Sequence, residues 1–173
     1  MTILVCPLSK VSEMIALYRP GRVISLLDPE WAFPELGPQY FGRHLRLGFH
    51  DVHAPAANHV MPSAEQIGDL LTFLAAWDRS DPLLIHCRAG IGRSPAAAFI
   101  AACFGNPHTP EHELALALRR AAPLARPNET LIRLADSAMG RCGRMSEAIA
   151  VTGRDLPWMD VDEGEPFRIL SSC

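Results

Sequence analysis

Cys87 and Arg93 open and close a short turn with the residue types of an anion-binding site. The apolar residues 83–86 predict a buried strand, and the residues from Pro95 onward predict a helix. A turn between a strand and a helix directs successive backbone N–H groups, and the positive end of the helix dipole, towards one point. Such a cradle binds an oxyanion such as phosphate, sulfate or arsenate.

The turn itself supplies the expected phosphate-binding groups. Gly90 and Gly92 give the backbone conformational freedom and let it approach the anion closely. The Arg93 guanidinium has the geometry to donate two parallel hydrogen bonds to two anion oxygens. The expected phosphate-binding residues are therefore Arg88, Ala89, Gly90, Ile91, Gly92 and Arg93.

Cys87 lies at the base of this cradle, where it is the expected nucleophile. The positive field of such a loop favours the thiolate form of a cysteine. A thiolate below a bound phosphate is placed for in-line attack, so we expect a phosphocysteine intermediate. Ser94 is expected to hydrogen-bond the sulfur and improve it as a leaving group, and His86 to hold the loop through a backbone hydrogen bond. The competing interpretation is a buried structural cysteine with a surface arginine nearby.

The elements that must position this turn alternate between strands and helices. Strands are predicted over 3–8, 22–27, 44–49 and 83–86, and helices over 12–18, 63–77, 95–104, from 110 and over 128–139, with an extension of the last helix through 148 left open. Ser12 is the expected N-cap of the first helix. This order predicts an α/β fold with a central, mostly parallel sheet flanked by helices. We expect a catalytic domain over 1–150 and an acidic tail, extended or disordered, over 151–173.

Size and composition fit one globular domain. The chain has 173 residues, a net charge of -3 and a pI near 6.1, which gives no reason to expect binding to nucleic acid or to an anionic membrane. Its start lacks the basic region of a signal peptide, and no apolar stretch is long enough to span a bilayer. The 5 cysteines are scattered without metal-binding spacing, so we expect free thiols in a reducing cytoplasm.

The run from His86 to Ser94 resembles the signature loop of the cysteine-dependent protein tyrosine phosphatases. The chain length is similar to that of the compact dual-specificity members, and the resemblance extends to Arg120, Pro127-Asn128 and Leu131 over roughly residues 1–140. It implies a tyrosine-phosphatase-like fold and no cofactor. Two positions depart from the family: Pro95 replaces a glycine, which suits a first helical turn, and Arg88 replaces a small residue and is expected to add positive charge at the pocket.

The resemblance also implies an aspartate on a separate loop that protonates the leaving oxygen and then activates water. Asp51 follows a predicted strand and precedes Cys87 by about the family's spacing. The alternatives are that Asp51 only caps a turn, or that Asp28 is the acid. His50, His53 and His59 surround Asp51, but without regular ligand spacing we expect no metal there and a role in shaping the loop.

The leading functional hypothesis is a phosphomonoester hydrolase acting on phosphotyrosine, with dual specificity for phosphoserine and phosphothreonine left open. One alternative is a phosphatase of a non-protein substrate, a phosphoinositide or nucleotide; related enzymes of that kind carry lysines in the loop, where this chain has Arg88. Another is a pseudophosphatase that only binds phosphorylated ligands, which would not need the thiol. A sulfurtransferase would leave Arg93 and Asp51 unexplained. The expected partner is a phosphorylated protein or a small phosphomonoester.

Overall fold

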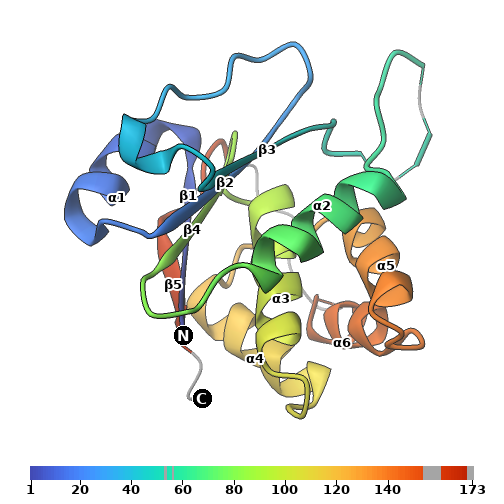
Figure 1. Cartoon of the computed structure of the whole chain (residues 1–173). Helices are drawn as coiled ribbons and strands as arrows, with labels where there is room; N and C mark the ends of the chain where they lie inside the picture. The colour runs from blue at the N-terminus through green and yellow to red at the C-terminus, as the bar shows by residue number, and fades with distance from the viewer. Residues whose placement is uncertain (53, 56, 154–160, 171–173) are drawn as a thin grey trace.

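The computed structural model describes the chain except residues 53, 56, 154–160 and 171–173. A mixed five-stranded sheet forms its centre, in the order β3-β2-β4-β1-β5 (Figure 1). The strands are β1 (Thr2–Pro7), β2 (Arg22–Leu27), β3 (His44–Gly48), β4 (Leu83–Cys87) and β5 (Phe167–Leu170). The first four are parallel, and β5 runs antiparallel to β1. The predicted α/β class with a mostly parallel sheet is therefore confirmed.

The end of β4 lies at the centre of one sheet edge. In the strand register, Cys87 is the partner of Pro7 on one side and of Leu26 on the other. The carboxyl ends of parallel strands meet at the same edge, so the segments that follow β1, β2 and β3 all converge near Cys87. The central strands are buried on both faces, which explains their nearly continuous apolar sequences.

Helices cover both faces of the sheet (Figure 1). They are α1 (Val11–Tyr18), α2 (Ala64–Ala75), α3 (Arg93–Gly105), α4 (Glu111–Ala121), α5 (Glu129–Ala138) and α6 (Arg144–Gly153). One apolar cluster joins α1 and Tyr40 to one face, and a larger one joins α2 through α6 to the other. Small residues such as Ala96 and Ala101 let α3 pack closely on all sides, so it is buried from Arg93 to Cys103.

Two helix boundaries differ from the sequence expectation. α1 begins after Lys10, which makes no side-chain cap, so the prediction that Ser12 is its N-cap is wrong. The helix predicted over 128–139 does not continue through 148. Gly140 and Gly143 adopt positive φ angles, 63° and 86°, and turn the chain before α6 begins.

The segment expected as an acidic tail contributes to the sheet. Residues 151–153 complete α6, and Phe167–Leu170 form β5, the edge strand beside β1. Between them, the N–H of Gly164 donates to the carbonyl of Ala89 at 2.7 Å, so this segment crosses the turn that follows β4. In the described part of the chain, no helix is both long and apolar enough to cross a membrane.

Candidate active site

The turn after β4, residues 87–93, forms the anion loop. Cys87 is 1% exposed, and its Sγ accepts a hydrogen bond from the Gly90 N–H at 3.2 Å and lies 3.1 Å from the Ser94 Oγ. Gly90 has a φ of 74°, and a Cβ there would lie only 2.9 Å from the Pro7 nitrogen. Only glycine therefore allows the loop to fold this tightly around the sulfur.

Neighbouring segments hold the anion loop from outside. Its carbonyls accept hydrogen bonds from four backbone N–H groups: Leu8 to Arg88 at 3.1 Å, Gly164 to Ala89 at 2.7 Å, Arg126 to Ile91 at 2.8 Å and Asn128 to Gly92 at 3.2 Å. In a trans peptide the N–H points away from the carbonyl. Because these carbonyls point outward, the N–H groups lie on the inner side of the loop, where an anion above Cys87 would accept hydrogen bonds from them.

Arg93 closes the loop with its side chain only 4% exposed. One terminal nitrogen, NH1, donates to Asp28 Oδ1 at 2.7 Å and to the Phe49 carbonyl at 2.6 Å. The buried Nε has no hydrogen-bond partner among the described residues, and it lies 4.0 Å from Asp51 Oδ2. The guanidinium is therefore fixed on one side while a buried donor remains for an anion.

Asp51 lies against the anion loop. A Cβ on Gly92 would collide with the Asp51 carboxylate. The absence of a side chain at Gly92 therefore makes room for this carboxylate. Asn128 Nδ2 donates to Asp51 Oδ1 at 2.7 Å, while Asn128 Oδ1 accepts from the Leu131 N–H at 2.9 Å and caps α5. The Asp51 side chain is 35% exposed, which leaves it accessible to a leaving group.

Sequence reasoning missed two of these roles. The sequence offers Asp28 only as an alternative acid, yet in the structure it is the ion-pair partner of Arg93. Asp28 directly follows β2, and β2 pairs with β4. This position at the carboxyl end of a neighbouring strand is the sequence feature that could have placed Asp28 near Arg93. In the sequence, Asn128 is marked only by the resemblance to the family, because its contact with Asp51 joins segments that are remote along the chain.

His86 is fully buried beneath the loop and belongs to a chain of polar groups. Its Nε2 lies 2.5 Å from the Ser25 Oγ, which also lies 2.7 Å from His44 Nε2. Burial, together with the nearby His44, lowers the pKa of His86 to about 4. Burial and the charge of Arg46 lower the pKa of His44 to about 4 as well. Both imidazoles are therefore neutral near pH 7, and through Ser25 the side chain of His86 links β4 to β2 and β3.

The remaining predicted residues lie around the rim. The Arg88 guanidinium stacks over the Trp31 ring, 4.9 Å from its centroid, so the charge of Arg88 is held by the segment after β2. His50 Nε2 lies 3.3 Å from Glu30, and the His50 ring packs edge-on against His59. His53 lies outside the described residues. Among those described, no group of three or more His, Cys, Asp or Glu side chains has metal-binding geometry.

Residues 23–105 match the sequence model of a family described as "Polymorphic toxin system, DSP-PTPase phosphatase". The matched range contains the anion loop, Asp28 and Asp51. Over this range, just under half of its length, the chain is similar to cysteine-based, DSP-PTPase-like phosphatases. A search of curated proteins found no significant match.

Solved structures of such phosphatases share the fold. The structure of DUSP15 is similar with a TM-score of 0.59 at 14% identity, over 90% of this chain and 92% of that one. The structure of a human tyrosine phosphatase-like serine/threonine/tyrosine-interacting protein has a TM-score of 0.60 at 16% identity, over 81% of this chain and 92% of that one. The structure of the Cydia pomonella PTP-2 phosphatase has a TM-score of 0.56 at 19% identity, over 78% of this chain and 84% of that one. At these identities the likeness is one of fold.

Proposed function

We propose that this DSP-PTPase-like domain hydrolyses phosphomonoesters through a phosphocysteine intermediate, with phosphotyrosine as the preferred substrate. The observation that carries the proposal is the convergence of a buried thiol, Cys87, with the Arg93 guanidinium and the Asp51 carboxylate around one small loop. A site that only captured phosphorylated ligands would need the loop and the arginine, but neither the thiol nor a carboxylate above it.

In the first step, the Cys87 thiolate attacks phosphorus and the ester bond to the leaving oxygen breaks. Protonated Asp51 gives its proton to that oxygen, so the product leaves as an alcohol or phenol. Arg93 and the inner N–H groups of the loop stabilise the charge on the three remaining phosphoryl oxygens. The buried Nε of Arg93, which makes no hydrogen bond within the described part of the chain, supports this role.

In the second step, the Asp51 carboxylate takes a proton from water, and the resulting hydroxide attacks the phosphocysteine. The P–S bond breaks, inorganic phosphate leaves, and the thiolate returns. Ser94, with its Oγ 3.1 Å from the Cys87 Sγ, stabilises the departing sulfur by hydrogen bonding. Because the reaction needs a reduced thiol, the proposed activity belongs in a reducing compartment such as the cytoplasm.

The substrate class remains part of the proposal. Dual specificity towards phosphoserine and phosphothreonine, and activity on a phosphoinositide or nucleotide, are its alternatives. Binding without turnover is another, because the fold also occurs in a protein described as phosphatase-like and interacting. A role in a polymorphic toxin system, taken from the family description, is likewise a proposal.

The decisive experiment compares wild type and Cys87→Ser on p-nitrophenyl phosphate, phosphotyrosine and phosphoserine peptides, phosphoinositides and nucleotides. We expect hydrolysis by wild type only, while Cys87→Ser still binds phosphotyrosine peptides. Acid-quenched wild-type enzyme should carry phosphate on Cys87, detectable by mass spectrometry. Residual turnover in Cys87→Ser equal to wild type would rule out the covalent mechanism.

A further inference from the structure

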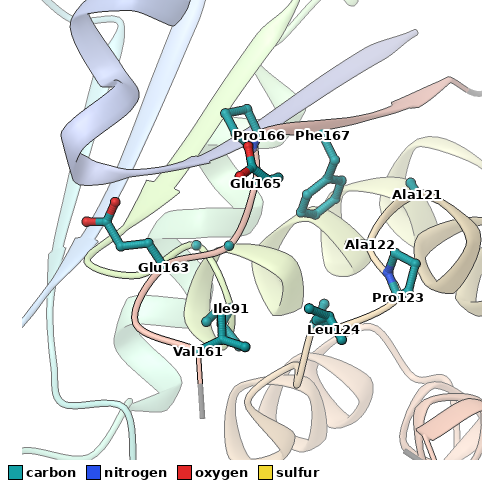
Figure 2. Close-up of a pocket in the computed structure, with 13 residues that line it drawn as sticks. Ile91, Ala121, Ala122, Pro123, Leu124, Val161, Glu163, Glu165, Pro166 and Phe167 are labelled. Atoms are coloured by element: carbon teal, nitrogen blue, oxygen red, sulfur yellow. The ribbon is translucent and has the colours of Figure 1, made fainter. Parts of the chain in front are cut away.

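A pocket of about 380 Å³ adjoins the outer side of the anion loop. Three segments line it: Gly90 and Ile91 of the loop, residues 121–125 between α4 and α5, and residues 161–167 before β5. Figure 2 shows the side chains of Ile91, Leu124 and Phe167 gathered around it. The anion loop is thus shared between two sites, with the cradle on its inner side and this pocket on its outer side.

The walls of the pocket are mostly apolar. Besides Gly90 and Ile91 of the anion loop and residues 163–165, the lining consists of alanine, proline and larger apolar residues: Ala121, Ala122, Pro123, Leu124, Ala125, Val161, Pro166 and Phe167. Leu124 is 41% exposed, although it is large and apolar. Leu124 therefore adds solvent-accessible apolar surface to the wall of the pocket.

The rim of the same pocket is acidic. Asp162, Glu163 and Glu165 are all exposed, and the last two line the pocket. The Glu163 carboxylate accepts a hydrogen bond from Ser9 Oγ at 2.7 Å, so it faces away from the apolar walls, as Figure 2 shows. The charges therefore lie along the edge and leave the interior apolar.

The acidic segment is fixed directly on the anion loop. Besides the hydrogen bond from Gly164 to Ala89, a Cβ at Gly164 would lie 3.3 Å from both the Gly90 oxygen and the Ile91 Cγ1. Only the backbone of the anion loop lies between this segment and the phosphate cradle. The pocket, the acidic segment and the phosphate cradle therefore share the same turn of backbone.

We propose that this pocket is a specificity subsite for a phosphopeptide, taking a large apolar side chain near the phosphorylated residue, with lysine or arginine alongside it facing the acidic rim. This inference rests on the proposed function and names its substrate class. Charge complementarity selects the occupant: a peptide with basic residues meets opposite charges at the rim. A phosphoinositide or a nucleotide would bring further phosphates towards Glu163 and Glu165 and would be disfavoured by like charge.

The test measures kcat/KM for phosphotyrosine peptides in which one leucine is scanned along both sides of the phosphorylated residue, against alanine at the same position. At the position that reaches the pocket, we expect leucine to be preferred by about tenfold or more. Replacing flanking arginines by glutamates should lower kcat/KM by roughly two- to fivefold, an effect that weakens at high salt.

Variants assign these preferences to the pocket. Leu124→Ser should reduce the leucine-to-alanine ratio, and Glu165→Gln should reduce the arginine-to-glutamate ratio. Glu65→Gln, an equal change of charge on α2, supplies the matched control and should alter neither ratio. Unchanged ratios in Leu124→Ser and Glu165→Gln would overturn the inference.

The outcomes separate this inference from the proposed activity. Cys87-dependent hydrolysis of p-nitrophenyl phosphate without any peptide preference would overturn the subsite while the activity stands. If no substrate is turned over, fluorescence anisotropy with Cys87→Ser and the same peptides tests the subsite by binding, and the same leucine preference would support it. A preference for phosphoinositides or nucleotides over every peptide would overturn it.

Discussion

The Arg93 guanidinium is paired with the Asp28 carboxylate at an NH1–Oδ1 distance of 2.7 Å, and both side chains are largely buried. Asp28 follows β2 directly, and Arg93 begins α3 after the strand next to β2. A second contact, from NH1 to the Phe49 carbonyl at the end of the β3 segment, fixes the same nitrogen. The sheet edge therefore sets the orientation of the arginine before any anion binds, which lowers the cost of ordering it on binding.

Loss of the contact with Asp28 should weaken catalysis, although Arg93 itself keeps its charge. We expect Asp28→Asn to lower kcat/KM for an aryl phosphate by about 10- to 100-fold, since the guanidinium loses its charged anchor.

Arg93→Lys should lower kcat/KM for the same substrate by about 100- to 1,000-fold and weaken inhibition by vanadate, because a point charge cannot replace the planar fork. Arg133→Lys, an exposed arginine on α5, is the control. Unchanged vanadate inhibition in Arg93→Lys would show that the anion binds elsewhere.

The contact between Asn128 and Asp51 predicts a leaving-group effect. Asp51→Asn should lower kcat by about 100-fold or more for an alkyl phosphate, whose leaving oxygen needs a proton, and by less for p-nitrophenyl phosphate. Asn128→Ser keeps an oxygen that caps α5 but removes the Nδ2 donor to Asp51, so it should show the same pattern more weakly. Equal losses on both substrates would remove Asp51 as the acid.

The two neutral histidines predict a loss of stability in acid. The pKa values of His86 and His44 are lowered to about 4 in the folded protein, from about 6.5. The unfolded chain therefore binds protons first, and the stabilising contribution is complete above about pH 6.5 and is lost as the pH falls towards 4. At pH 4.5 the loss is about 2 kcal/mol for His86 and less for the partly exposed His44.

Urea unfolding of wild type and His44→Gln at pH 7 and pH 4.5 checks this prediction. Glutamine keeps a hydrogen-bonding group towards Ser25 but cannot take up a proton, so the variant should lose less stability on acidification. If wild type and variant lose the same free energy of unfolding, His44 does not contribute to the acid sensitivity.

The sequence predicted the parts of the site that are local in the chain. The strand, loop and helix around Cys87 follow from apolar runs, glycines and a proline, which are short-range signals. The position of Asp51 needed the resemblance to the family, because no pattern within the chain relates it to a loop so far along the sequence. The same holds for the Ser25 bridge between His44 and His86, which depends on the register of three strands.

The C-terminal segment shows why composition alone was insufficient. Asp162, Glu163 and Glu165 gave this segment the character of a tail. Two residues after Glu165, the 4 residues Phe167–Leu170 are enough to add an edge strand, because β1 offers an unpaired row of backbone groups. Whether such a short strand pairs depends on a free edge that no local sequence signal reveals.

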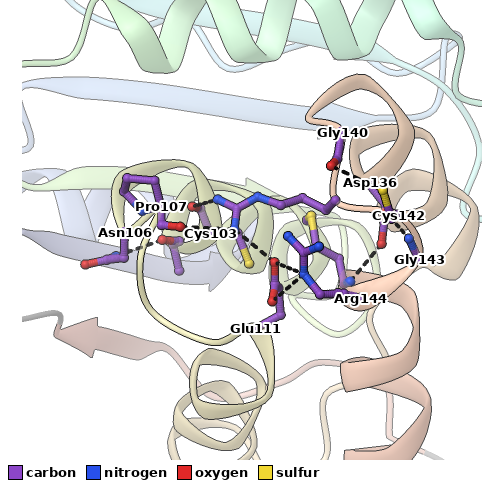
Figure 3. Close-up of polar contacts among 12 residues, drawn as sticks. Cys103, Asn106, Pro107, Glu111, Asp136, Gly140, Cys142, Gly143 and Arg144 are labelled. Carbon is purple, nitrogen blue, oxygen red and sulfur yellow. Dashed lines mark hydrogen bonds and ion pairs between the residues drawn. The ribbon is translucent and has the colours of Figure 1, made fainter.

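The far end of α3 is held by a buried ion cluster, drawn in Figure 3. The Glu111 carboxylate accepts from Arg141 at 2.9 Å and from Arg144 at 3.1 Å, and Arg141 also donates to the Cys103 carbonyl at 2.9 Å. Burial would raise the pKa of Glu111, but its hydrogen bonds to the backbone and to the two arginines hold it below the usual value. The cluster therefore joins α3, α4 and the turn before α6.

Breaking this cluster should affect stability and leave the chemistry intact. Glu111→Ala leaves the buried Arg141 without its carboxylate, and we expect the free energy of unfolding to fall by about 3 kcal/mol. Arg144→Ala is the matched control: its side chain is 54% exposed, so the loss should stay below about 1 kcal/mol. Because the cluster contacts α3 at Cys103, about 15 Å along the helix from the anion loop, folded Glu111→Ala should retain wild-type kcat at low temperature. Equal losses of stability in the two variants would contradict the assignment of Arg141 as the buried partner.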